Sequence, residues 1–192
     1  MTLSERREMP TVYEPAEDSR LLAETVAPEV APDERVLEVG VGSGYVAATV
    51  EDEAGARVVG SDIAPDACAA AREAGVEAVR ADLLDPFVGD TFDIVLFNPP
   101  YLPTPPEMEW DDPLEHALSG GPDGRRLVRP FLDSVGRVLR PGGRVFLLVS
   151  SLTDIEAVTE LATAAGLDVR ERAGESFPFE RLVVLEIISS NA

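Results

Sequence analysis

The sequence predicts an α/β protein built on a doubly wound, mostly parallel sheet with helices on both faces. Three observations support this fold class. Short apolar segments alternate with longer amphipathic segments, which is the pattern of repeated strand–helix units. A glycine-rich turn, 40–44, directly follows the first apolar segment. The last two apolar segments are joined by 174–180, which is too short for a crossover helix, so these two strands should run antiparallel to each other.

The expected elements follow one another along a single domain. The first helix should have Asp18 or Ser19 as its N-cap, because their side-chain oxygens accept hydrogen bonds from the free amides of a helix start. A proline-rich loop is expected from Leu102 to about Gly124. The expected helices are 20–26, 45–54, 65–74, 126–139 and 154–165, and the expected strands are 35–39, 57–62, 76–80, 92–96, 144–149, 168–173 and 181–188.

The length and composition indicate one globular domain. The chain has 192 residues, 45% of them hydrophobic, and we expect a flexible N-terminal lead over 1–12 and the domain over 13–192. No apolar run approaches the ~20 residues of a membrane span, and the polar start contains no secretory signal. The single cysteine, Cys68, excludes an internal disulfide and a cysteine-based metal cluster, and its Ala-rich context predicts buried packing. We therefore expect a cytoplasmic protein with no membrane contact and no metal.

The charge balance is strongly acidic. The formal net charge is −20, the isoelectric point is about 4.2, and all 16 basic residues are arginine. Charges are screened within ~3 Å at 1 M salt and acidic surfaces stay hydrated there, so we interpret this composition as a halophilic adaptation to concentrated intracellular salt. Such a surface also repels nucleic acid at ordinary ionic strength, so no direct nucleic-acid partner is expected, although screening weakens this argument.

A stiff corner, Phe97-Asn98-Pro99-Pro100-Tyr101, follows the fourth expected strand. Two consecutive prolines fix φ, remove two backbone donors and prevent a helix from starting at once. The corner therefore presents the Asn98 side-chain oxygen and backbone carbonyls as acceptors, beside the ring of Tyr101. Two acceptors and a ring suit a planar –NH2 group, although an Asn-Pro pair alone is usually only a turn.

The first strand and the turn after it favour a cationic ligand. Glu38 lies inside the strand, in the pattern Glu38-x-Gly40-x-Gly42-x-Gly44. Glycines let the backbone and the next helix start approach a ligand closely, and a buried acid needs a cation or a donor beside it. An ammonium or sulfonium group therefore fits this position better than a pyrophosphate does.

Two further strand ends add nucleoside-binding chemistry. Asp62, followed by Ile63, ends the second strand, where an acid can accept hydrogen bonds from both ribose hydroxyls. Asp82 and Leu83 end the third strand and offer a carboxylate to an exocyclic amine and an apolar face to a purine. Open α/β sheets bind their ligands at the carboxyl ends of adjacent strands, so these features should meet.

With these motifs the chain resembles class I S-adenosylmethionine-dependent methyltransferases, which have a Rossmann-like seven-stranded sheet, mostly parallel with an antiparallel last strand. More narrowly, 13–19 (Tyr-Glu-Pro-Ala-Glu-Asp-Ser), Asn98-Pro99-Pro100-Tyr101 and 117–121 (Ala-Leu-Ser-Gly-Gly) are similar to the HemK family of release-factor glutamine methyltransferases, in its short archaeal and eukaryotic form. The resemblance implies catalytic roles for Asn98, Pro99 and Tyr101, and substrate binding by these residues and Pro100. It implies that S-adenosyl-L-methionine, with S-adenosyl-L-homocysteine as product, is bound by Ser19, Glu38, Gly40, Gly42, Asp62, Ile63, Asp82, Leu83 and Asn98.

The activity that the resemblance implies is N5-methylation of the glutamine in the Gly-Gly-Gln loop of a class I peptide release factor. The amide proton can leave after transfer, so no strong general base is required and the sole histidine, His116, is a weak candidate. The loop 102–124 is expected to bind substrate. Methylation of adenine N6 or guanine N2 in DNA or RNA, methylation of a protein lysine, and a noncatalytic cofactor-binding scaffold remain alternatives.

The strand near Val76–Arg80 is expected at an edge of the sheet in the usual strand order of this fold. An unprotected edge can pair with another polypeptide. Short HemK-type enzymes work with a small zinc-binding activator subunit, so the resemblance implies a heterodimer formed through this edge. Arg125, Arg126 and Arg129 are expected at a helix start beside carboxylates.

Overall fold

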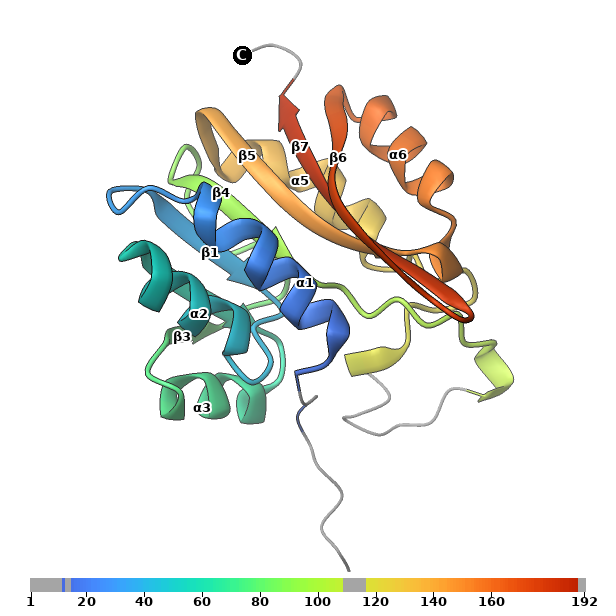
Figure 1. Cartoon of the computed structure of the whole chain (residues 1–192), viewed down its shortest axis with the longest axis horizontal. Helices are drawn as coiled ribbons and strands as arrows, with labels where there is room; N and C mark the ends of the chain where they lie inside the picture. The colour runs from blue at the N-terminus through green and yellow to red at the C-terminus, as the bar shows by residue number, and fades with distance from the viewer. Residues whose placement is uncertain (1–11, 13–14, 109–116, 190–192) are drawn as a thin grey trace, which may run out of the picture.

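The computed structural model describes residue 12, residues 15–108 and residues 117–189. Seven strands form one sheet in the order β3-β2-β1-β4-β5-β7-β6 (Figure 1). β7 pairs antiparallel with both β5 and β6, and the other neighbours pair in parallel, which confirms the predicted fold class. Of the expected N-terminal lead, only residue 12 lies within the described residues. The strands are β1 (Arg35–Val39), β2 (Arg57–Asp62), β3 (Glu77–Arg80), β4 (Phe92–Phe97), β5 (Leu139–Ser150), β6 (Leu167–Phe177) and β7 (Glu180–Ser189).

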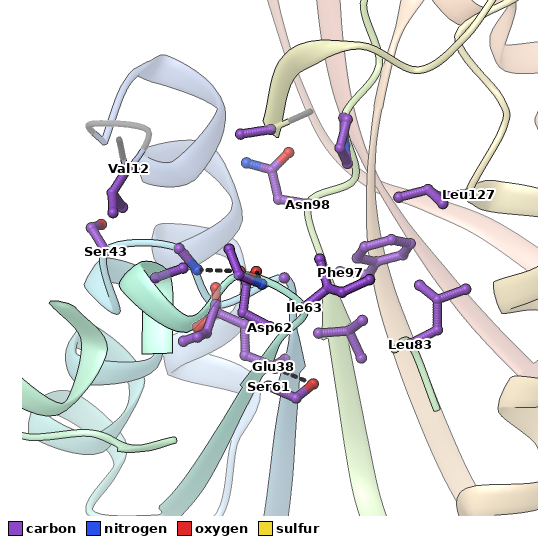
Figure 2. Close-up of a pocket in the computed structure, with 18 of the residues that line it drawn as sticks. Val12, Glu38, Ser43, Ser61, Asp62, Ile63, Leu83, Phe97, Asn98 and Leu127 are labelled. Atoms are coloured by element: carbon purple, nitrogen blue, oxygen red, sulfur yellow. Dashed lines mark hydrogen bonds between the residues drawn. The ribbon is translucent and has the colours of Figure 1, made fainter. Parts of the chain in front are cut away.

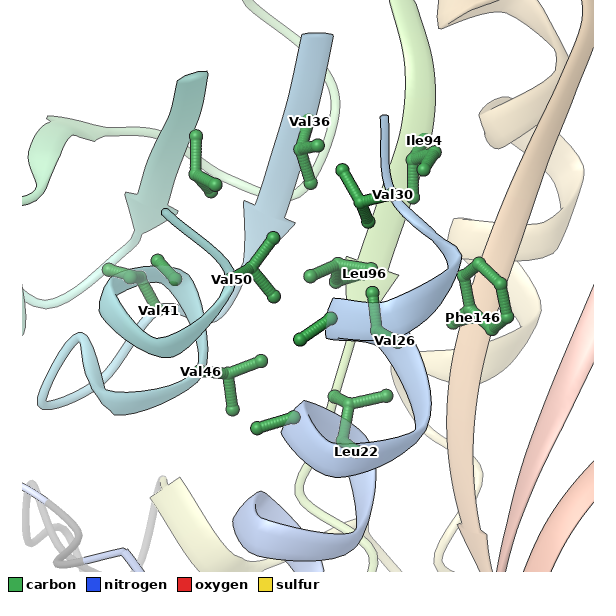
Figure 3. Packing of buried hydrophobic residues seen from close by; sticks show 14 of the residues in the cluster. Leu22, Val26, Val30, Val36, Val41, Val46, Val50, Ile94, Leu96 and Phe146 are labelled. Carbon is green, nitrogen blue, oxygen red and sulfur yellow. The ribbon is translucent and has the colours of Figure 1, made fainter. Parts of the chain in front are cut away.

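Helices cover both faces of the sheet, because buried strand residues alternate between two apolar clusters. Val36 joins the cluster on one face, whereas its neighbour Leu37 joins the cluster on the other. Figure 3 shows the first cluster, in which Leu22 of the first helix packs near Leu96 and Phe146 of the sheet. The first cluster includes residues of α1 (Glu17–Val26), α2 (Tyr45–Ala54) and α3 (Pro65–Glu73), and the second includes residues of α5 (Val128–Val138) and α6 (Ile155–Ala164).

Three helices begin at residues other than those expected, and α6 differs by a single residue, because it begins at Ile155 after Asp154 as its N-cap. α1 begins at Glu17 with Ala16 as its N-cap, so Asp18 and Ser19 lie inside the first turn and the capping prediction is wrong. Two acids in that turn still favour the helix electrostatically, because the N-terminal end of a helix has a partial positive charge. α5 begins at Val128, so the prediction that Arg126 starts this helix is also wrong.

β4 and β7 exceed the expected bounds by one residue at one or both ends, whereas β5 and β6 are several residues longer because sheet pairing continues through polar or glycine-containing segments. β5 already begins at Leu139, which pairs with Phe92, and a register irregularity accommodates the Pro-Gly-Gly turn before pairing resumes at Arg144. β6 continues through 174–177, so the expected connection 174–180 shrinks to the two-residue turn Pro178-Phe179. The antiparallel arrangement of these strands is confirmed.

Three further expectations can be compared with the structure. β3 lies at one edge of the sheet, as predicted, and β6 lies at the other. Cys68 is 1% exposed on α3 and joins the first apolar cluster, which confirms its packing role. Within the described ranges, none of the helices is long and apolar enough to cross a membrane.

Candidate active site

A cavity of about 340 Å³ lies at the carboxyl ends of the first four strands. Here the chain turns from β1 toward β2 on one side and β4 lies on the other, which is the point where open α/β sheets bind ligands. Figure 2 shows Glu38, Asp62 and Asn98, from three different strand ends, around this space. Ten of the predicted site residues line the cavity: Ser19, Glu38, Gly40, Gly42, Asp62, Ile63, Asp82, Leu83, Asn98 and Pro100.

The glycine turn after β1 is tight because its glycines adopt left-handed backbone angles. Gly40, Gly42 and Gly44 have φ values of +66°, +51° and +83°. A Cβ at Gly44 would lie 2.9 Å from the Cα of Ala71 in α3, so a side chain cannot fit there. The turn therefore brings the start of α2 directly over the cavity.

Glu38 is a buried acid at the base of the cavity. Glu38 is only 2% exposed, and its Oε2 accepts a hydrogen bond of 2.8 Å from the Ala47 amide in the first turn of α2. Burial raises the pKa of Glu38 from 4.5 to about 8, the Ala47 hydrogen bond opposes this change, and the charge of Asp62 adds to it. A cation bound beside Glu38 would favour the ionised carboxylate and lower this pKa again.

Asp62 is fixed in orientation by two backbone amides. Its Oδ2 accepts a hydrogen bond of 3.1 Å from Gly42, and its Oδ1 accepts one of 2.9 Å from Ala64. A carboxylate oxygen has a second lone pair, so both oxygens can still accept from hydroxyl groups in the cavity. Two vicinal hydroxyls of a ribose match this arrangement.

Ile63 and Leu83 contribute apolar surface to the cavity wall. Ile63 is 59% exposed, which is high for a branched apolar residue next to a cavity. Leu83 has a φ of +43°, a left-handed angle that is unfavourable for a residue with a side chain. Backbone strain of this kind is concentrated at ligand sites. Both side chains offer apolar surface on which a flat group can lie. Asp82 lies beside them on the same wall.

Asn98 presents a buried oxygen to the site. Within the described part of the chain, its Oδ1 is a buried atom without a hydrogen-bond partner. Leaving such an acceptor unpaired costs about 1–3 kcal/mol, so a donor from a ligand is expected to pair with it. The neighbouring Phe97 ring packs on Phe131 of α5, with centroids 4.6 Å apart, and holds the corner against the core.

The other two residues of the corner lie differently. Pro99 is buried and is not among the residues that line the main cavity. Tyr101 lines a second cavity, of about 210 Å³, together with residues of α1 and of the β6–β7 hairpin. The structure therefore brings Asn98 and Pro100 to the first cavity and Tyr101 to the second.

The described ends of the loop after the corner pair with each other. The Leu102 amide donates to the Leu118 carbonyl at 3.0 Å, and the Gly120 amide donates to the Leu102 carbonyl at 2.9 Å. His116, with the rest of 109–116, lies outside the described residues.

The sequence did not identify Arg126 as a cavity residue. Arg126 lines the main cavity, and its guanidinium donates to the Ser119 carbonyl at 3.0 Å and to the Ser119 hydroxyl at 3.3 Å. The sequence feature that could have pointed to Arg126 is Gly124, which marks a tight turn two residues earlier. A Cβ at Gly124 would lie 2.5 Å from the Tyr101 carbonyl oxygen, so this turn packs directly against the corner. Phe97 and Leu127 also line the cavity and were not predicted.

Comparison with known proteins identifies the family. A methyltransferase domain family matches residues 36–117. A protein of Methanocaldococcus jannaschii described as a putative protein N5-glutamine methyltransferase is 37% identical over 182 residues, which cover 92% of this chain and 91% of that protein. The human methyltransferase HEMK2 is 33% identical, with 93% of this chain and 90% of that protein covered.

A solved structure is similar over nearly the whole chain. It is the E. cuniculi Mtq2-Trm112 complex, described as responsible for methylation of the eRF1 translation termination factor, with a TM-score of 0.78, 28% identity, and 94% of this chain and 100% of that chain covered. The chain belongs to the HemK family of protein N5-glutamine methyltransferases.

Proposed function

We propose that the protein transfers a methyl group from S-adenosylmethionine to N5 of the glutamine in the Gly-Gly-Gln loop of a class I peptide release factor. The observation that supports this most directly is the buried Asn98 Oδ1, which has no partner among the described residues. A carboxamide –NH2 supplies the donor that this oxygen lacks. The relatives named for glutamine methylation, and the solved complex named for methylation of a termination factor, favour glutamine over a nucleobase.

The residues around the main cavity fit the proposed cofactor. Glu38 would lie near its cationic groups, Asp62 would accept from the ribose hydroxyls, and Ile63 and Leu83 would contact the purine, with Asp82 near the exocyclic amine. The strained Leu83 and the exposed Ile63 are the structural features that support this fit. S-adenosylmethionine would supply an electrophilic methyl group bonded to a sulfonium. Ser19, Gly40, Gly42 and Asn98 complete the proposed cofactor-binding residues.

The corner would activate a poor nucleophile by orienting it. The lone pair of an amide nitrogen is delocalised into the carbonyl. Asn98 Oδ1 and the Pro99 carbonyl would accept the two amide hydrogens, raise the electron density on nitrogen and aim it at the methyl group. We propose that Tyr101 packs against the amide or the backbone beside it. The proton leaves after transfer, so the residues need only position and desolvate the substrate.

We also propose that a small zinc-binding activator subunit pairs with β3. The outer side of β3 has no strand neighbour among the described residues, and Val79 on it is 37% exposed. Ile63 lies close to this strand, because the Arg80 guanidinium donates to its carbonyl at 2.9 Å. The likeness to one chain of a two-protein complex supports a partner of this kind. Such a heterodimer would act in the cytoplasm, where release factors work.

A methyl-transfer assay tests the proposed function. The protein and its activator are incubated with labelled S-adenosylmethionine and one of three acceptors: the release factor, a release factor whose loop glutamine is replaced by alanine, or DNA and RNA. We expect label only in the unmodified release factor. Label in nucleic acid, or in the factor that lacks the glutamine, would contradict the proposal.

A further inference from the structure

We propose that the tip of the β6–β7 hairpin, residues 177–180, is the docking site for the polypeptide segment next to the target glutamine, and that this segment is basic. This inference rests on the proposed function and adds a surface for the substrate protein outside the amide-binding corner. β6 and β4 run in the same direction (Figure 1). The hairpin tip that follows β6 therefore lies on the side of the sheet where the carboxyl ends of the parallel strands meet, which is also where Asn98 follows β4.

The second cavity connects the hairpin with the catalytic corner. It is lined by Tyr101 of the corner, by Phe177, Glu180 and Leu182 of the hairpin, and by 16–18 at the start of α1. Pro100 lines the first cavity and Tyr101 lines the second, so the two spaces lie on either side of one short segment. An extended chain advances up to ~3.3–3.6 Å per residue, so the second cavity is within reach of the residues next to a glutamine held at Asn98.

The hairpin tip is held by strand pairing on both sides of its turn. The strands remain paired up to Phe177 and Glu180, and only Pro178 and Phe179 form the turn. Proline fixes φ at its own position, which removes conformational freedom from the turn. The base is fixed as well, because the Ser150 hydroxyl donates to Glu180 Oε1 at 2.5 Å and the Arg181 amide donates to the Ser151 hydroxyl at 2.9 Å.

Phe179 is the exposed anchor of this surface. It is 95% exposed, which is the largest value among the large hydrophobic residues that the structure describes as exposed. Rigid aromatic side chains that are exposed in the free protein are typical hot spots of interfaces, since they bury much area and lose little entropy. Val88 is a second strongly exposed apolar residue, at 76%, but it lies far from the corner. It precedes β4, so it lies at the amino end of this strand, whereas the corner follows the carboxyl end.

The charge of the second cavity indicates the chemistry of the occupant. Glu17, Asp18 and Glu180 are among its lining residues, and no described residue in the lining is basic. A segment that contains arginine or lysine complements these acids, whereas an acidic or nucleic-acid occupant is repelled. The acidic lining favours a basic occupant, and Tyr101 belongs both to the corner and to the second cavity. Both observations therefore favour the substrate polypeptide as the occupant.

The test compares Phe179→Ala with Val88→Ala. Both replace an exposed apolar side chain, but Phe179 lies at the carboxyl ends of the parallel strands and Val88 lies at their amino ends. With the intact heterodimer and whole release factor as acceptor, we expect Phe179→Ala to raise the KM for the release factor about tenfold or more, as truncation of a hot spot does. The kcat, the KM for S-adenosylmethionine and the thermal midpoint should match wild type. Val88→Ala should leave all four quantities unchanged. Glu180→Gln, which preserves the acceptor for Ser150, should also raise the KM for the release factor and reduce its dependence on salt.

The outcomes separate this inference from the proposed function. If wild type methylates the release factor but both alanine variants have the same KM, the docking surface is wrong and the function stands. If Phe179→Ala instead converts a dimer of this chain into a monomer, a second copy covers Phe179 and the inference is overturned. If wild type does not methylate the release factor, the proposed function fails and this inference fails with it.

Discussion

Replacing Asn98 by alanine should separate stability from turnover. The buried Oδ1 of Asn98 has no partner among the described residues, and an unpaired buried acceptor destabilises the folded protein by about 1–3 kcal/mol. Truncation removes this penalty and loses a comparable amount of packing from a small, partly buried side chain. We therefore expect the free energy of unfolding to stay within about 1 kcal/mol of wild type.

The effect on catalysis should be much larger. If Oδ1 accepts an amide hydrogen and orients the nitrogen, its loss removes about 3 kcal/mol of transition-state stabilisation, which corresponds to roughly a 150-fold lower kcat. Two measurements are needed. Denaturant titration at constant salt gives the free energy of unfolding, and single-turnover methyl transfer with saturating cofactor and release factor gives the rate of the chemical step.

Two results would refute this reasoning. Turnover near the wild-type rate would show that Asn98 does not hold the substrate amide. A loss of more than about 2 kcal/mol of unfolding free energy, with a parallel loss of activity, would assign Asn98 to packing of the corner instead. The unpaired Oδ1 of Asn98 predicts a third result, in which stability is intact and the rate of methyl transfer falls strongly.

Three further predictions concern the rest of the site and the surface. Glu38 binds a proton more tightly in the folded protein, with a pKa of about 8 against 4.5, so its contribution to the free energy of unfolding is largest below pH 4.5 and falls as the pH rises to about 8. At about 1.4 kcal/mol per pH unit this fall is at most about 5 kcal/mol, and it should be absent from Glu38→Gln when Tm is followed against pH; parallel profiles would contradict it. Gly124→Ala places a Cβ 2.5 Å from both the Tyr101 carbonyl oxygen and Thr153 Cγ2, so it should cost about 1–3 kcal/mol of unfolding free energy and slow turnover. Gly55→Ala, at a similar φ of +68° with no atom within 4 Å, is the matched control for backbone strain alone and should leave turnover unchanged. The net charge of −20 predicts that Tm rises between about 0.1 and 1 M KCl, as the screening length falls from ~10 to ~3 Å, and a flat Tm would argue against a halophilic surface.

The central strands were predictable because their burial leaves little choice of residue. Parallel strands covered on both faces are rich in apolar residues, and β1, β2 and β4 each contain at least two consecutive apolar residues and lead to a glycine, an acid or the Asn-Pro corner. The carboxyl ends of neighbouring strands meet at one edge, so the approximate positions of Glu38, Asp62 and Asn98 followed from strand order alone.

The remaining features depend on contacts between distant parts of the chain. The segment 174–176 contains a glycine and two polar residues, and it becomes strand because β7 supplies its hydrogen bonds. Arg126 reaches the cavity because the turn at Gly124 packs against the Tyr101 carbonyl; the glycine marks a turn, but the local sequence does not show which distant segment the turn contacts. The division of the corner between two cavities likewise follows from where the hairpin lies.

The arrangement of acceptors at the corner has a consequence for what the enzyme makes. Under the proposed function, Asn98 Oδ1 and the Pro99 carbonyl are both acceptors, so each requires an N–H from the substrate. A glutamate has no hydrogen to offer and would place its own oxygens against them, and it should be rejected. A glutamine that has received one methyl group retains a single N–H and can satisfy only one of the two acceptors. The corner should therefore release its product after one methyl transfer and should not form a dimethylated amide.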